Sequence, residues 1–269
     1  MLALGALLAS SAAADLLSLQ GSFTQGGLVQ GRVPADAKVT LDGTPVRLGE
    51  GGVFLIGFDR DAKSDAVLEI HYADGASMRR LLAIEQRHYE VQRINGLPAR
   101  TVTPDAAGLK RITEDRARIA AAREIESATL WFQDGFVWPA VGPISGTYGT
   151  QRILNGEPRQ PHFGVDVAAA IGTPVGAAAD GVVSLAETDM MLTGKTVVID
   201  HGLGLNTVYS HLDDIAVGSG DPVRKGQMIG RVGATGRVSG PHLHWGANLF
   251  QIPLDPALLV GPMPAASSQ

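Results

Sequence analysis

Residues 240–245 read Gly-Pro-His-Leu-His-Trp, and this stretch decides both the fold and the chemistry of the chain. In a β-strand, residues two positions apart project from the same face. A strand here places the imidazoles of His242 and His244 side by side, while Leu243 and Trp245 point the other way and anchor the strand. Two imidazoles on one face can bind one metal ion together. Alternatively, one can bind while the other stays free for proton transfer.

A second stretch, residues 161–167, reads Pro-His-Phe-Gly-Val-Asp-Val. In a fully extended strand, His162 and Asp166 would lie about 13 Å apart, too far to share one ion. A helix would bring them together, but Gly164 and the neighbouring valines disfavour one. We therefore expect a bend followed by a strand from Val165, which folds His162 back toward Asp166.

Five of the seven histidines lie between residues 162 and 244, in a chain without cysteine. A metal must then be held by nitrogen and oxygen ligands. Two imidazoles and the Asp166 carboxylate make a three-ligand zinc site with an open position, where zinc lowers the pKa of water to about 7. Two histidines remain, His211 and one of the His242/His244 pair. They are candidates for general base and for oxyanion stabilisation.

The composition indicates a folded, turn-rich β protein. Apolar residues make up 45% and charged residues 18% of the 269 residues, enough to bury the core of one large or two small domains. The 34 glycines and 15 prolines favour tight turns. The net charge of −5 disfavours a dedicated nucleic-acid binder, so we expect no nucleic-acid partner.

Four segments are expected along the chain. Residues 1–14 are interpreted as the remnant of a signal peptide, because an apolar run ends in three alanines. Residues 15–100 are expected to form a small β-sandwich, because short apolar runs flank Asp-Gly turn signals at 42–43 and 74–75.

A linker helix is expected over 101–130, with Thr103 as its N-cap and Pro104 in its first turn. Lys110, Glu114 and Arg118 follow at i, i+4 spacing, which is typical of a solvated helix. Residues 131–269 are expected to be β again. The strands of this last segment are predicted over 181–185, 196–200, 207–211 and 228–232.

Residues 143–260 resemble the lysostaphin/LytM-like zinc metallopeptidase family, which cleaves peptide bonds in bacterial peptidoglycan. The matching stretches follow the family's order: 161–169, 172–175, 179–183, 199–204, 207–212, 220–230 and 233–245. The resemblance implies a mainly β protein in which a small N-terminal β-sandwich and a linker helix precede a compact all-β catalytic domain of the duplicated hybrid motif. It also implies one Zn²⁺ per chain.

Carried over residue by residue, the resemblance implies five site residues: zinc ligands His162, Asp166 and His244, and a catalytic pair, His211 and His242. His242 would take a proton from the attacking water, and His211 would help to stabilise the tetrahedral intermediate. His201 matches a family histidine that is not a ligand, so we expect it to be structural. Tyr148, Arg152 and Asn155 precede the first motif and are expected to line the substrate groove.

The expected function is a zinc-dependent endopeptidase acting on peptidoglycan stems or cross-links, periplasmic or secreted to the cell wall. Its expected partners are peptidoglycan and other cell-wall hydrolases or division proteins, without stable membrane insertion. One alternative is a non-hydrolytic or autoinhibited zinc-containing regulator of such hydrolases, because the apolar stripe of the linker helix is thin. Another is phosphotransfer on histidine without zinc, which Asp166 in ligand spacing disfavours.

Overall fold

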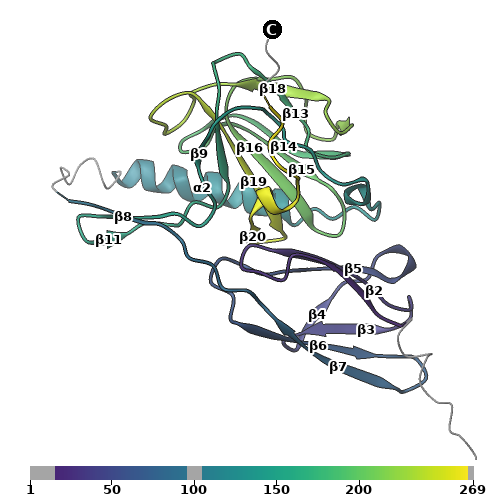
Figure 1. Ribbon diagram of the computed structural model, residues 1–269. Coiled ribbons are helices and arrows are strands. Elements are labelled where there is room, and N and C mark those ends of the chain that lie inside the picture. The colour runs from purple at the N-terminus through teal and green to yellow at the C-terminus, as the bar shows by residue number, and fades with distance from the viewer. Residues whose placement is uncertain (1–15, 96–104, 266–269) are drawn as a thin grey trace, which may run out of the picture.

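The computed structural model describes residues 16–95 and 105–265, which form two β-rich parts and a long helix (Figure 1). The stretch interpreted as a signal peptide lies outside these residues. Within the described ranges, no helix is both long enough and apolar enough to cross a bilayer. The mainly β fold expected from the sequence is confirmed.

The N-terminal part is a sandwich of two antiparallel sheets, with strand orders β1-β2-β5 and β4-β3-β6-β7. Its core is built from alternate residues of facing strands, among them Phe54, Ile56 and Leu68. The strands are β1 (Ser18–Gly21), β2 (Leu28–Arg32), β3 (Lys38–Leu41), β4 (Thr44–Val46), β5 (Val53–Gly57), β6 (Asp65–His71) and β7 (Ser77–Ala83), with a 3-10 turn η1 at Glu50–Gly52. The predicted Asp42-Gly43 turn joins β3 to β4, and both residues have the positive φ that such hairpins require.

Helix α2 (Ala106–Arg123) begins after Asp105, whose carboxylate accepts a hydrogen bond from Gly108 N at 2.8 Å. The predicted cap at Thr103 lies outside the described residues. The helix ends at Arg123, earlier than expected. The next segment is instead held on the sheet, where Ser127 N donates to the Asp200 carboxylate at 3.0 Å.

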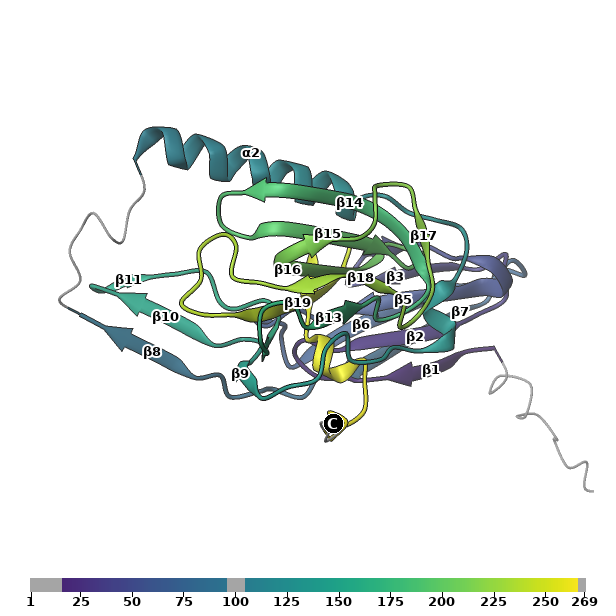
Figure 2. The same ribbon diagram turned by 90° about the horizontal axis from the view of Figure 1, so that it is seen from above.

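Helix α2 exposes the charged residues Lys110 and Glu114 to solvent, as its charge pattern predicted, but its other face packs against the sheet. Figure 2 shows it running along β14, and Ile112, Asp115 and Ala122 on its inner face are buried. Ala122 and Ile119 pack against Leu185 and other apolar residues of the sheet. A thin apolar stripe is sufficient because the helix covers only one edge of the sheet.

The C-terminal part is a ten-stranded sheet with the order β17-β14-β15-β16-β19-β12-β9, to which β13, β18 and β20 are attached. Its strands are β9 (Ile144–Gly146), β12 (Val165–Ala168), β13 (Pro174–Gly176), β14 (Gly181–Met190), β15 (Gly194–Asp200), β16 (Leu205–Ile215), β17 (Pro222–Val223), β18 (Met228–Val232), β19 (His242–Leu249) and β20 (Ile252–Leu254). The 3-10 turns η2 (Trp131–Asp134) and η3 (Pro256–Leu258) complete it. All four strands predicted in this region are present, three of them longer than expected.

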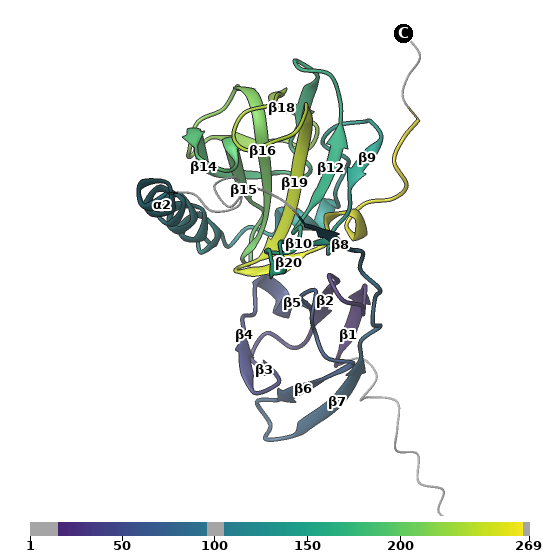
Figure 3. The same cartoon turned by 90° about the vertical axis from the view of Figure 1, so that its left-hand side faces the viewer.

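The two parts share an apolar interface (Figure 3). Strand β5 is buried on both faces: Phe54 and Ile56 face the sandwich core, whereas Val53 and Leu55 pack against Leu205 and its neighbours in the C-terminal part. This explains why residues 53–56 read as a continuous apolar run rather than an alternating one.

A third sheet crosses the sequence boundary expected near residue 100. Strand β8 (Val91–Ile94) pairs in parallel with β10 (Gln151–Leu154), which pairs antiparallel with β11 (Glu157–Pro158). Nearby, Arg87 forms an ion pair with Asp255 at 2.8 Å. Residues 90–95 therefore belong in space with the C-terminal part, although the sequence assigns them to the first domain.

Candidate active site

Three side chains meet at one point above the C-terminal sheet. Nε2 of His162 lies 3.0 Å from Oδ1 of Asp166 and 2.9 Å from Nδ1 of His244, and the third side of this triangle, from His244 Nδ1 to Asp166 Oδ1, is also 3.0 Å. These residues form the one group of potential metal ligands found among the described residues. They are the three that the resemblance implies as zinc ligands.

Strand pairing brings the three together. Strands β12 and β19 are antiparallel neighbours in which Asp166 faces His244 and Ala168 faces His242. His162 precedes β12 in an irregular segment that leads into the strand at Val165, as the sequence predicted. The alternation of β19 buries Leu243 and Trp245 in the core and leaves the histidines on the other face.

Hydrogen bonds to backbone carbonyls orient the site histidines. Nδ1–H of His162 donates to Thr147 O at 3.1 Å, which directs its Nε2 at Asp166 and His244. Nδ1–H of His242 donates to Gly240 O at 2.9 Å, and its Nε2 lies 3.7 Å from Asp166 Oδ1. Such bonds fix the tautomer and the direction of the free nitrogen.

His211 completes the cluster from β16. Its ring centroid lies 4.9 Å from that of His242, and its Nδ1–H donates to Thr235 O at 2.9 Å. Its φ is +65°, a left-handed conformation that costs a non-glycine residue roughly 1–3 kcal/mol. This strain, absorbed by the surrounding sheet, aims the imidazole at the ligand triangle.

Burial and hydrogen bonding set the protonation states. Burial alone would raise the pKa of the Asp166 carboxyl, but hydrogen bonds with His162 and His244 outweigh it and hold that pKa well below its usual range. Burial lowers the pKa of His211 to about 4 and also lowers the pKa of His244. Burial would lower the pKa of His162, but the hydrogen bond with Asp166 outweighs it and raises that pKa. An anionic carboxylate therefore lies beside the imidazoles, and cation binding would displace a proton from His162.

The triangle fits a tetrahedral divalent cation. Ligand atoms bound tetrahedrally at about 2.0–2.1 Å lie about 3.3 Å apart, close to the observed separations of 2.9–3.0 Å. Two imidazoles and one carboxylate suit zinc, whereas Mg²⁺ and Ca²⁺ prefer oxygen ligands alone. Three protein ligands leave a position open.

The three residues predicted to line the substrate groove differ in burial and in their hydrogen-bond partners. Tyr148 is a correction: its side chain is 2% exposed, and its hydroxyl donates to Pro253 O in the interior. Arg152 is exposed on β10, where its Nε donates to Gln92 at 3.2 Å. Asn155 lies in the β10–β11 turn. The backbone N–H of His162 donates to Thr150 O, just before this hairpin, at 2.8 Å.

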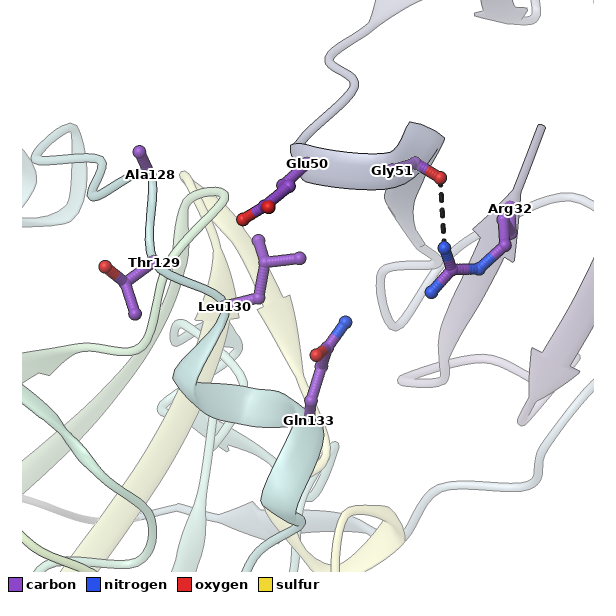
Figure 4. A pocket seen from close by; sticks show the side chains of 7 residues that line it. All are labelled: Arg32, Glu50, Gly51, Ala128, Thr129, Leu130 and Gln133. Carbon is purple, nitrogen blue, oxygen red and sulfur yellow. Dashed lines mark hydrogen bonds between the residues drawn. The ribbon is translucent and has the colours of Figure 1, made fainter. Parts of the chain in front are cut away.

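His201 lies in the core rather than in the cluster. Its Nδ1–H donates to Asp180 O, and its Nε2 lies within hydrogen-bond distance of the Thr207 hydroxyl oxygen, both at 2.7 Å. A cleft of about 630 Å³ between the two parts of the protein also contains no histidine. Figure 4 shows its lining, in which Arg32 donates to Gly51 O and the Glu50 side chain extends toward Leu130.

Two glycines that sequence reasoning missed make room for the ligands. A Cβ on Gly146 would lie 2.4 Å from Oδ2 of Asp166, and a Cβ on Gly164 would lie 2.6 Å from both His244 Cε1 and Trp245 O. Both positions need a residue without a side chain because the ligands occupy that space. The sequence offered a hint in Gly164, which stands inside the first motif.

We expect Gly164→Ala to weaken metal binding by about 10- to 100-fold, because the added methyl displaces His244. Overpacking of this kind also lowers the free energy of unfolding by about 1–3 kcal/mol. Chelator competition and urea titration measure the two effects. Gly218→Ala is the matched control, because its Cβ would meet only Asp221 at 3.6 Å. Wild-type affinity in Gly164→Ala would contradict this account of the site.

Comparison with known proteins places the chain in a family. Residues 160–256 match peptidase family M23. A crystal structure of a Pseudomonas aeruginosa protein assigned to peptidase M23 is 30% identical, covers 89% of this chain and 96% of that chain, and superposes with a TM-score of 0.67. The chain therefore belongs to peptidase family M23, and the resemblance seen in its motifs is confirmed at that level.

Two curated relatives match the C-terminal part. The DD-carboxypeptidase/endopeptidase Mpg of Neisseria meningitidis is 43% identical over 103 residues, which are 38% of this chain and 24% of that protein. The peptidoglycan DD-endopeptidase ShyA of Vibrio cholerae is 49% identical over 85 residues, which are 32% of this chain and 20% of that protein. The chain thus spans a quarter or less of the length of these relatives.

Proposed function

We propose that this protein is a zinc-dependent endopeptidase that hydrolyses peptide bonds in peptidoglycan stems or cross-links. The observation that carries the proposal is the convergence of His162, Asp166 and His244 on one point, with Nε2 of His242 facing it. The names of the two curated relatives support the substrate class, because both are peptidases and one acts on peptidoglycan.

His162, Asp166 and His244 would hold the zinc ion, which when bound polarises the scissile carbonyl and acidifies the attacking water. His242 keeps a bare Nε2 because its Nδ1–H is engaged by Gly240 O. That nitrogen accepts a proton from the water and passes it to the leaving amine.

The role of His211 follows from its tautomer. With Nδ1–H held by Thr235 O and the pKa lowered to about 4 by burial, the imidazole is neutral and its Nε2 is an acceptor. It therefore aligns the attacking water by accepting a hydrogen bond. It can donate to a developing oxyanion, as the resemblance implies, only after it has gained a proton.

Location and partners follow from the substrate. Peptidoglycan lies outside the cytoplasmic membrane, so we propose a periplasmic or cell-wall location. Association with other cell-wall hydrolases or division proteins stays a prediction. A non-hydrolytic regulator is not favoured, because all five chemical positions hold the residues that hydrolysis requires.

The test is release of soluble peptides from purified sacculi by the full chain, with zinc measured on the same sample. We expect one zinc per chain, release that stops on chelation and returns with zinc, and fragment masses that identify the bond. One zinc per chain without any release would overturn the proposed activity.

A further inference from the structure

Helix α2 carries a buried carboxylate outside the metal cluster. Asp115 is 5% exposed, and its Oδ2 accepts a hydrogen bond from Met191 N at 2.7 Å, while its Oδ1 pairs with Arg118 at 2.5 Å. A buried carboxylate is costly unless such bonds satisfy it. Arg111 on the same helix donates to Asp189 O at 2.7 Å. The bond to Met191 fastens the helix to the β14–β15 turn, and the bond to Asp189 fastens it to the end of β14.

The β14–β15 turn, residues 191–193, touches the backbone that carries the catalytic pair. His211 N donates to Thr193 O at 2.8 Å. Arg237 N, from the loop that leads to His242, donates to Leu192 O at 2.9 Å. Strand β15 continues this contact, because Lys195 N donates to the Thr235 hydroxyl at 2.9 Å. The turn therefore lies between α2 and the His211 backbone.

The contact at Thr193 supports a strained residue. His211 holds a φ of +65°, and its ring is oriented by Thr235 O, which belongs to the loop held by this turn. A strained conformation persists only where its surroundings over-determine it. If the turn shifts, both the backbone bond and the ring acceptor of His211 shift with it.

We propose that Asp115 is a positioning residue for His211, acting through the β14–β15 turn. This inference rests on the proposed function and adds a task for the linker helix, which otherwise only covers the sheet. Asp115 touches no reacting atom; it holds the turn that holds the imidazole. Burial alone would raise the pKa of Asp115, but its bonds to Met191 N and Arg118 lower it, so it accepts these bonds as a carboxylate.

The experiment compares Asp115→Ala, Asp115→Asn and Glu114→Ala in the full zinc-loaded chain. Glu114 is the matched control, because it is exposed on the same helix and its one ion pair among the described residues is with Lys110 at 3.8 Å. We expect Asp115→Ala to lower kcat on sacculi by about 10- to 100-fold with little change in KM or zinc content. Asp115→Asn should recover most of kcat, because its amide oxygen can still accept from Met191 N.

A second readout does not depend on activity. The His211 Nδ1–H resonance in a long-range ¹H–¹⁵N spectrum should be sharp in the wild type and Glu114→Ala, and shifted or broadened in Asp115→Ala. Wild-type kcat, an unmoved His211 resonance, or an equal loss in Glu114→Ala would overturn the inference. If wild-type protein releases no peptides, the proposed function fails, and the resonance still decides the inference.

Should Asp115→Ala not fold, Arg111→Met replaces it, because Arg111 is largely exposed and leaves no buried gap. The expected result is a smaller loss of kcat with the same displacement of the His211 resonance. An unchanged resonance together with an unchanged kcat would overturn the role of the turn.

Discussion

His242→Ala is expected to slow peptide release from sacculi by about 10²- to 10⁴-fold while leaving the bound zinc unchanged. The imidazole supplies the free Nε2 next to the ligand triangle but is not one of its three corners. Removing it therefore takes away proton transfer without removing a ligand. Initial rates on sacculi, with metal analysis of the same sample, measure both quantities.

The matched control is His88→Ala, because His88 is exposed and lies outside the ligand cluster. It should retain wild-type rate and zinc content. Full activity in His242→Ala would remove the proton-transfer role. Loss of zinc from His242→Ala would instead make this residue a ligand and overturn the assignment of His244.

The second large effect is a loss of stability on acidification through His201. Burial lowers the pKa of His201 to about 4 in the folded protein, against about 6.5 in an unfolded chain. Between pH 4 and about pH 6.5, His201 is protonated in the unfolded chain but neutral in the folded protein. The stabilisation is thus complete above pH 6.5 and is lost as the pH falls toward 4. It amounts to about 3 kcal/mol, of which about 2 kcal/mol disappears between pH 7 and pH 5.

Urea unfolding at several pH values between 7 and 5 measures this loss. His201→Gln should be less stable at pH 7, because the bonds to Asp180 O and Thr207 are disturbed. Its stability should nevertheless fall less steeply with pH than that of the wild type. His71→Gln, which changes an exposed histidine, should keep the wild-type slope. Equal slopes in all three proteins would show that His201 is protonated without unfolding.

The sequence predicted the ligand cluster because local geometry determines much of it. A two-residue period sends His242 and His244 to one face, and the glycine in the first motif forces the bend before Asp166. The direction of each free nitrogen could not be predicted in this way. It depends on the backbone carbonyls of Thr147, Gly240 and Thr235, and the sequence pattern does not show where these carbonyls lie.

Tyr148 and α2 show where sequence reasoning failed. Tyr148 was assigned to the groove from its position before the first motif, yet its ring is buried near Tyr89 and Phe163. The charges of α2 predicted a solvated helix, and Lys110 and Glu114 are exposed, but the bonds of Asp115 and Arg111 to the sheet were not predicted. In each case the position of the side chain is determined by contacts with residues distant in sequence. The periodicity of the sequence does not predict such contacts.

The parallel pairing of β8 with β10 has a consequence for how this chain can be divided. A fragment that starts at residue 131 loses β8, so it exposes the hydrogen-bonding edge of β10. It also loses the Arg87 partner of Asp255. The catalytic half therefore depends on contacts with residues that precede it in the sequence. A fragment that keeps both contacts must begin before Arg87, and it still exposes the apolar residues that pack against Val53 and Leu55 of β5.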